Sequence, residues 1–324
     1  GYGGYLSLVL QFPEFVDVVE GISSEFNTFH EMIKGTKGYK APFKVAILNC
    51  WGKLRSWQTN QVAHALWYKE IYSYVGVLEA LSGMAFEIEF INFEDIKSHG
   101  IASDIGIIIN SGDAMTAWSG GQNWLDEAVI TKIREWVYQG GGFIGIGEPT
   151  AIQNQGKYFQ LFDVLGVDKD LTYGLSYRKY HELTTEHFIL EDVKGDIDFG
   201  RGMSGVFKKG DHTTILAMNQ NDILLSVNEY GNGRGIYIAG LPYSSQNARL
   251  LKRAIYYAAH QEEALMAYEV DNVEVECTYF PEVKKLALYN NSFEEQVAKV
   301  MVHGKVYLTI NLNEMEIRWI MMRI

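Results

Sequence analysis

The sequence predicts an α/β protein in which a parallel-sheet domain is followed by a small antiparallel β domain. The first observation is the alternation of apolar, strand-like runs with amphipathic helices between residues 44 and 260. That order produces a parallel sheet with right-handed crossovers. The second is the texture after Glu263, where short strands and turns alternate about every 10–14 residues, as in small antiparallel domains.

The composition is that of a globular chain with two or three domains. Its 324 residues are 47% hydrophobic and 21% charged, and 28 basic against 40 acidic residues give a net charge of −12. An acidic chain repels a phosphate backbone, and there is no run of 18 apolar residues, so we expect neither nucleic acid nor membrane as a partner. Cys50 and Cys277 fit buried strand positions, and so few cysteines favour a reducing, cytoplasmic location.

Residues 1–42 contain a glycine-rich turn, one long helix and a linker. Pro13 suits a first helical position, and the linker at 35–38 begins and ends with glycine. One face of the helix collects the apolar side chains of Phe15, Val18, Val19, Ile22, Phe26, Phe29 and Ile33. No strand precedes this helix for it to pack on, so we expect a further segment upstream of Gly1.

Residues 43–263 form the predicted α/β domain. The run at 45–50 is continuously apolar, as expected for a strand that is covered on both faces. Further strands are predicted at 86–92, 105–110, 142–146 and 235–239, and helices at about 62–82, 124–138 and 245–260. The stretch at 168–230 is less regular and contains several short strand candidates.

Residues 264–324 form the predicted antiparallel domain. One strand is expected over 270–280, with Val273, Val275 and Cys277 on one side and Glu274 and Glu276 on the other. Turns at 290–291 and 303–304 separate the later strands, at 286–289, 300–302 and 306–308. A core of about 60 residues is marginal alone, so we expect this domain to pack on its neighbour.

The glycine-rich turn at 140–149 follows a strand and invites two functional interpretations. A dinucleotide fingerprint needs a third glycine where Thr150 stands, and a nucleophile elbow needs Ser or Cys where Gly147 stands. The sheet therefore resembles an amidotransferase-like (flavodoxin-like) domain that lacks its nucleophile. Tight turns and close packing are the simplest explanation of the glycines themselves.

Two loops follow strands at the edge where open α/β sheets bind ligands. The loop after the first strand carries Trp51, Lys53, Arg55 and Trp57, whose aromatic faces and charges suit either a sugar or anion site or a domain interface. The loop at 111–124 is long, which suits either a ligand site or docking on another domain.

A possible anion site lies at Tyr2, Gly3, Gly4 and Tyr5, ahead of the long helix. Glycine-rich turns and helix starts both present backbone N–H groups to an anion, although plain N-terminal coil is the alternative. The eight histidines show no spacing typical of metal ligands, so we expect no metal.

Several segments resemble the galactosyl-N-acetylhexosamine phosphorylases, the lacto-N-biose phosphorylase family that includes galactosyl-rhamnose phosphorylases. These segments lie at 1–6, 44–57, 79–83 and 90–96, and the Trp-Gly-Lys-Leu-Arg-Ser-Trp run within the second is the most specific. The resemblance spans essentially the whole chain. It implies that 1–42 is the end of an N-terminal (β/α)₈ barrel, that 43–263 is an amidotransferase-like central domain, and that 264–324 is the C-terminal β domain.

The resemblance also implies a reaction. Family members carry out reversible, inverting phosphorolysis of a β-galactoside to α-galactose 1-phosphate and a free acceptor sugar. Phosphate is the nucleophile and a carboxylic acid protonates the leaving oxygen, so no cofactor is expected. The acid would belong to the absent part of the barrel, so no catalytic residue is assigned in this chain and the chain alone is expected to be inactive.

The expected partners follow from that reaction. They are a β-galactoside disaccharide, phosphate, the barrel domain of the same protein and a second copy in a homodimer. The residues at 2–5 would line the phosphate or substrate site, and the loop from Trp51 to Trp57 would border it. The acceptor stays open among N-acetylglucosamine, N-acetylgalactosamine and rhamnose. A stand-alone carbohydrate-binding or oligomerisation module without catalysis is the alternative.

Overall fold

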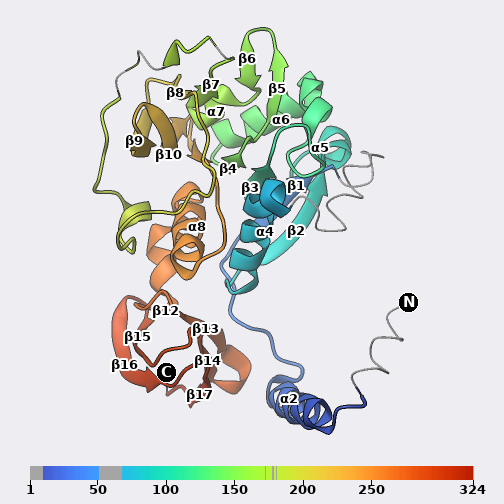
Figure 1. Ribbon diagram of the computed structural model, residues 1–324, viewed down its shortest axis with the longest axis vertical. Helices are drawn as coiled ribbons and strands as arrows, with labels where there is room; N and C mark the ends of the chain where they lie inside the picture. Colours follow the sequence, from blue (N-terminus) through green and yellow to red (C-terminus); the bar gives the residue numbers. More distant parts are fainter. Residues whose placement is uncertain (1–9, 51–67, 172, 177–178, 180, 324) are drawn as a thin grey trace.

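The computed structural model describes residues 10–50, 68–171, 173–176, 179 and 181–323. Figure 1 shows an α/β body at one end of the long axis, a smaller all-β body at the other, and a helix beside the smaller body. Each body has its own apolar core, and the two cores share no buried residue. The chain is thus a mixed α/β protein with a mostly parallel central sheet and small antiparallel sheets.

A seven-stranded sheet forms the centre of the larger body. Its strand order is β2-β1-β3-β4-β11-β10-β9, and the first five strands are parallel, whereas β10 and β9 are antiparallel. The strands are β1 (Lys44–Asn49), β2 (Glu87–Asn92), β3 (Ile105–Gly112), β4 (Gly142–Gly147), β9 (Thr213–Asn219), β10 (Asp222–Tyr230) and β11 (Gly233–Ile238). The predicted parallel strands are confirmed, and the irregular stretch supplies the antiparallel pair.

Both faces of this sheet are covered. The side chains of β4 point alternately to the two faces, and all six of its residues are buried. Helices α4 and α8 pack together, and α5 packs with α6. The helices are α4 (Tyr68–Ser82), α5 (Phe93–His99), α6 (Glu127–Tyr138), α7 (Phe162–Leu165) and α8 (Ser245–Ala258), with 3₁₀ turns η1 (Gly121–Leu125), η3 (Phe188–Leu190) and η4 (Glu262–Met266). Two small hairpins pair β5 (Ala151–Asn154) with β6 (Lys157–Phe159), and β7 (Val167–Lys169) with β8 (Val206–Lys208).

The smaller body consists of two three-stranded antiparallel sheets. One contains β12 (Tyr268–Val270), β15 (Gln296–Val302) and β16 (Lys305–Leu312); the other contains β13 (Val275–Phe280), β14 (Lys285–Asn290) and β17 (Ile317–Met321), with the 3₁₀ turn η5 (Pro281–Val283) between β13 and β14. The prediction of short antiparallel strands in this part of the chain is confirmed, but the prediction of one continuous strand at 270–280 is wrong. The chain leaves one sheet after Val270 and joins the other at Val275.

Helix α2 (Pro13–Ile33) lies apart from both cores, and none of its residues is buried. Its predicted limits and its proline start are confirmed, and Phe29 contacts Trp319 of β17 with ring centroids 5.7 Å apart. Much of the apolar face predicted from the sequence is exposed, at Phe15, Val18, Val19, Ile22 and Phe26. Among the described helices none is both long and apolar enough to cross a membrane.

The linker after α2 runs along both bodies. The Tyr39 amide donates to the Tyr279 carbonyl at 2.6 Å, and the Ala41 amide donates to the Ala85 carbonyl at 2.8 Å. The Tyr39 ring also meets the Tyr268 ring edge-on, with centroids 4.9 Å apart. Neighbouring residues of the linker are therefore attached to different bodies.

Two helical glycines provide a matched test of packing. A Cβ on Gly76 of α4 would collide with the Leu241 carbonyl, whereas nothing lies within 4 Å of a Cβ on Gly21 of α2. We expect Gly76→Ala to lower the free energy of unfolding by about 2–3 kcal/mol, despite the higher helix propensity of alanine. Gly21→Ala should raise or preserve it, and urea denaturation measures both. Equal effects of the two substitutions would contradict the close approach of α4 to Leu241.

Candidate functional site

The carboxyl ends of the parallel strands define the candidate site. Strands β2 and β3 lie on opposite sides of β1, so the strand order reverses at β1, and open α/β sheets bind ligands at such a reversal. At this edge β1 ends at Asn49, β3 at Gly112 and β4 at Gly147. The residues that directly follow β3 and β4 are both acidic, namely Asp113 and Glu148.

Glu148 is the best-ordered charge at this edge. Its carboxylate accepts hydrogen bonds from the Ala114 amide at 2.9 Å, the Tyr158 hydroxyl at 2.8 Å and the Lys169 ammonium at 2.5 Å. Burial alone would raise the pKa of Glu148, but Lys169 and the Ala114 amide outweigh it, so the pKa is lowered. Burial and the charge of Glu148 raise the pKa of Tyr158. At neutral pH Glu148 is therefore a carboxylate and Tyr158 a neutral phenol.

A second pair lies on the same side of the sheet, where Arg201 binds Asp113 at 2.6 Å. The guanidinium also lies over the ring of Tyr72, 5.8 Å from its centroid, and about half of the arginine side chain is exposed. The loop that carries Arg201 is attached to α4 and α8, because Tyr72 donates to the Phe199 carbonyl and Asn247 donates to the Asp198 carbonyl. Carboxylates, guanidinium groups and aromatic faces are the groups that bind sugar hydroxyls and rings.

Gly147 has the backbone geometry of a sharp turn but no reactive side chain. Its φ of +79° suits glycine, and a Cβ would lie 3.1 Å from the Gly112 carbonyl oxygen. The next amide, of Glu148, donates to that same carbonyl at 3.0 Å. The chain then enters β5 rather than a helix, so the strand–turn–helix geometry of a nucleophile elbow does not form here.

The predicted site residues lie outside the described residues. This holds for Tyr2, Gly3, Gly4 and Tyr5 and for Trp51, Lys53, Arg55 and Trp57. The loop at 111–124 is described and folds back on its own domain, with Trp118 and Trp124 buried in the central core. Cys50 is also buried, and its thiol donates to the Ala117 carbonyl at 3.2 Å.

Sequence reasoning missed the residues that assemble at this edge. Glu148 could have been found, because it directly follows a predicted strand at the ligand-binding edge. Lys169 and Arg201 come from the irregular stretch after residue 168, and no local pattern brings them to Glu148 and Asp113. Only the tertiary fold does so.

Comparisons with known proteins identify the family. The description "Lacto-N-biose phosphorylase central domain" fits residues 44–263, the C-terminal domain of that family fits 268–320, and its N-terminal TIM barrel domain fits 1–41. The central match alone covers more than half of the chain. The chain therefore belongs to the lacto-N-biose phosphorylase family, as its sequence resemblance suggested.

Curated relatives agree with this assignment. The chain is 45% identical over 323 residues to a 1,3-β-galactosyl-N-acetylhexosamine phosphorylase of Lachnoclostridium phytofermentans, covering 98% of this chain and 44% of that protein. It is 39% identical to the enzyme of the same name from Bifidobacterium longum subsp. longum, covering 98% and 47%. It is 34% identical to a D-galactosyl-β-1→4-L-rhamnose phosphorylase of L. phytofermentans, covering 95% and 41%. The chain spans less than half the length of these relatives.

The contact between Lys169 and Glu148 is testable by a double-mutant cycle. Lys169→Gln leaves a largely buried carboxylate without its cation, so we expect a loss of about 2 kcal/mol in the free energy of unfolding at pH 7.5. Glu148→Gln combined with Lys169→Gln should cost less than the two single losses together.

The pH dependence provides a further check of this pair. Because folding lowers the pKa of Glu148, the stabilisation exists above the ordinary carboxyl pKa and disappears as pH falls. The difference between wild type and Lys169→Gln should therefore narrow in acid. Strictly additive losses at pH 7.5 would show that the two groups do not interact.

Proposed function

We propose that this chain is the C-terminal portion of a glycoside phosphorylase. The reaction is reversible, inverting phosphorolysis of a β-galactoside of the galacto-N-biose or lacto-N-biose type, giving α-galactose 1-phosphate and a free acceptor sugar. The observation that carries the proposal is that three domains of one phosphorylase family match the chain in their family order. The relatives bear the names of such phosphorylases, which supports the enzyme class.

The chemistry divides between this chain and a barrel. Phosphate attacks the anomeric carbon on one face of the sugar, and a carboxylic acid protonates the leaving oxygen on the other face. We place the acid in barrel sequence outside this chain and assign no catalytic residue here. The turn from Tyr2 to Tyr5 would contribute backbone N–H groups to the phosphate. Inorganic phosphate is a co-substrate, and no other cofactor is proposed.

Helix α2 supports the division into domains at 1–42, 43–263 and 264–324. Its exposed stripe of Phe15, Val18, Val19, Ile22 and Phe26 follows helical spacing, as on a helix that packs on a sheet. We propose that α2 is the last helix of the barrel and that the barrel of the same protein covers this stripe. The contact of Phe29 with Trp319 would then join the barrel to the β domain.

The central domain is proposed to be amidotransferase-like without a nucleophile, and to act as a wall of the sugar site. Strand β1, which the loop from Trp51 to Trp57 follows in the sequence, ends at the edge where Arg201 and Glu148 lie. We propose that this edge faces the barrel, so that Lys53 and Arg55 border the substrate. A homodimer in a cytoplasmic setting is the proposed state of the whole protein.

The first test uses the chain as it stands. Residues 1–324 should not release galactose 1-phosphate from lacto-N-biose, galacto-N-biose or galactosyl-rhamnose, because positioning of phosphate opposite the acid supplies much of the rate. Joining the barrel of a relative to its N-terminus should restore turnover. Measurable turnover by purified 1–324 would show that the proposal places the chemistry in the wrong domain. A folded, inactive fusion that still binds sugar would favour the binding-module alternative.

The second test addresses the loop. In the barrel fusion, Arg55→Ala should lower kcat/KM by about tenfold or more, equivalent to about 1.4 kcal/mol, if Arg55 reaches substrate or phosphate. Cys50→Ser is the matched control next to the loop and should keep kcat within about threefold, because the proposal uses no covalent nucleophile. If Arg55→Ala leaves both kcat/KM and the melting temperature unchanged, the loop has no role at the substrate site.

A further inference from the structure

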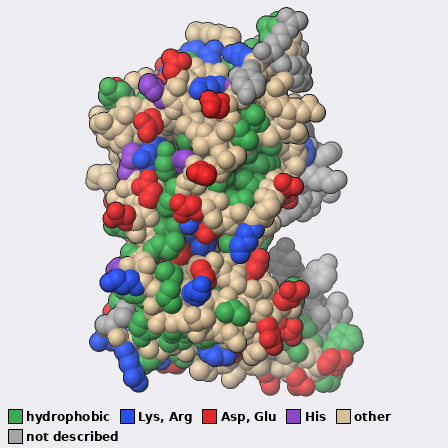
Figure 2. All heavy atoms as spheres, turned by 90° about the vertical axis from the view of Figure 1, so that its left-hand side faces the viewer, with side chains coloured by type: hydrophobic (Ala, Val, Ile, Leu, Met, Phe, Trp, Pro, Cys, Tyr) green, Lys and Arg blue, Asp and Glu red, His purple; other side chains and the backbone are tan. Residues whose placement is uncertain are grey.

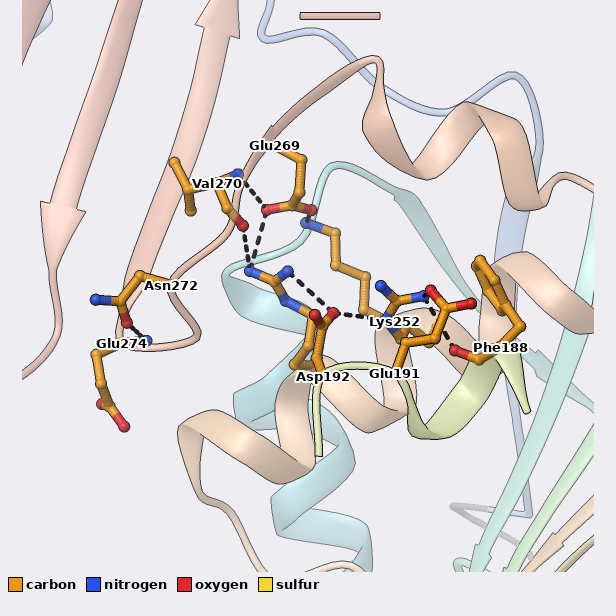
Figure 3. Close-up of polar contacts among 10 residues, drawn as sticks. Phe188, Glu191, Asp192, Lys252, Glu269, Val270, Asn272 and Glu274 are labelled. Carbon is orange, nitrogen blue, oxygen red and sulfur yellow. Dashed lines mark hydrogen bonds and ion pairs between the residues drawn. The ribbon is translucent and has the colours of Figure 1, made fainter. Parts of the chain in front are cut away.

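The junction between the two bodies is built on charged side chains of α8. Figure 2 shows that the molecule narrows where the bodies meet and that acidic and basic side chains lie close together at this level. Figure 3 shows Lys252 reaching Glu269 of β12, and Asp192 and Glu191 beside the same helix. Arg249 binds both Asp192 and Glu269 at 3.3 Å, and it also donates to the Val270 carbonyl at 2.9 Å. One helix thus holds β12 and the turn at 188–192 together.

The charges at this junction do not balance. Three cations of α8, Arg249, Lys252 and Arg253, face four carboxylates. Ion pairs account for Glu191, Asp192 and Glu269. The fourth carboxylate, Glu276 of β13, has neither a hydrogen bond nor an ion pair among the described residues. Glu276 is half-buried.

Glu276 is held in a confined place. A Cβ on Gly83, just beyond the end of α4, would collide with all three atoms of its carboxylate group. The carboxylate lines a cavity of about 30 Å³, the space of a single water, between the end of α4, α8 and β13. A half-buried charge in such a place loses part of its hydration, and no hydrogen bond among the described residues replaces it.

Every neighbouring element contributes a charged or titratable group. The charged or titratable groups that share the cavity of Glu276 are Arg249 and Lys252 of α8, Glu269 of β12, Cys277 of β13, and Tyr243 before α8. Tyr289 of β14 lies opposite Glu276 in the sheet, and Glu79 of α4 acts on Tyr243. Burial raises the pKa of Glu276, Lys252 opposes this, and the negative charge of Glu269 adds to it. The pKa of Glu269 is lowered instead, because Lys252 and Arg249 outweigh its own burial.

We propose that Glu276 makes the junction between the α/β body and the β body sensitive to pH. The junction tightens when Glu276 takes up a proton and loosens when Glu276 loses it. The sign follows from linkage: folding raises the affinity of Glu276 for its proton, so stability falls as pH rises from the ordinary carboxyl value through the folded one. The paired carboxylates work in the opposite sense, since their stabilisation disappears in acid.

The test compares Glu276→Gln with a control on the same sheet. Glutamine copies the protonated shape, so Glu276→Gln should melt about 2 °C above wild type at pH 8, and the difference should vanish as pH falls toward 4. Glu282→Gln removes an exposed carboxylate beyond the end of β13 and should follow wild type at every pH. A variant that melts at or below wild type at pH 8, or that differs equally at both pH values, would overturn the proposal.

Hydrogen exchange examines the junction directly, in case melting reports on one body alone. After correction for intrinsic rates, the amides of β12 and β13 in wild type should be less protected at pH 8 than at pH 4, whereas those of β3 should not. In Glu276→Gln the loss at β12 and β13 should be absent. An equal loss in wild type and variant would assign the effect to another group.

Discussion

The burial of cations on one face of α8 is the constraint on which the rest of this structure depends. Arg249 and Arg253 are each less than a tenth exposed, and a charge removed from water needs partners with good geometry. Those partners come from the turn at 188–192 and from Glu269, segments that lie on either side of the helix in the chain. Satisfying them fixes where the irregular stretch returns to the sheet and where the β body begins. The ion pairs of Arg249 and Lys252 with Glu269 are among the contacts that join the two bodies.

The candidate site lies in the α/β body, at the carboxyl ends of its parallel strands. Because neighbouring parallel strands end at one edge, Asp113 after β3 and Glu148 after β4 lie at the same edge although they are not close in sequence. Glu148 and Asp113 are each fixed by a cation from the stretch between β7 and β8 or its flanks, so the edge is rigid as well as polar. Under the proposed function, this polar edge with aromatic neighbours would close over a sugar held by the barrel and would need no nucleophile of its own.

Sequence patterns predict much of the fold and little of the site. Buried parallel strands such as β3 and β4 contain short apolar runs bounded by turn residues, so they were found. The strand predicted at 270–280 failed because the adjacent polar residues Asp271 and Asn272 interrupt the alternation where the backbone changes sheet, and side-chain polarity does not record which partner a strand has. Lys169 and Arg201 were missed because their roles arise from contacts across the fold, and the loop carrying Trp51 and Arg55 lies outside the described residues.

The linker between α2 and β1 has a consequence for how the protein is made. Its amide at Tyr39 pairs with Tyr279, whose strand leaves the ribosome among the last segments, whereas Ala41 pairs with Ala85, which emerges early. The α/β body can therefore collapse during synthesis while the helix ahead of it still lacks its docking strand. The contact of α2 with Trp319 can form only after β17 has been synthesised. A nascent chain that stops before β17 would thus hold a finished central core and an α2 that is not yet joined to the β body.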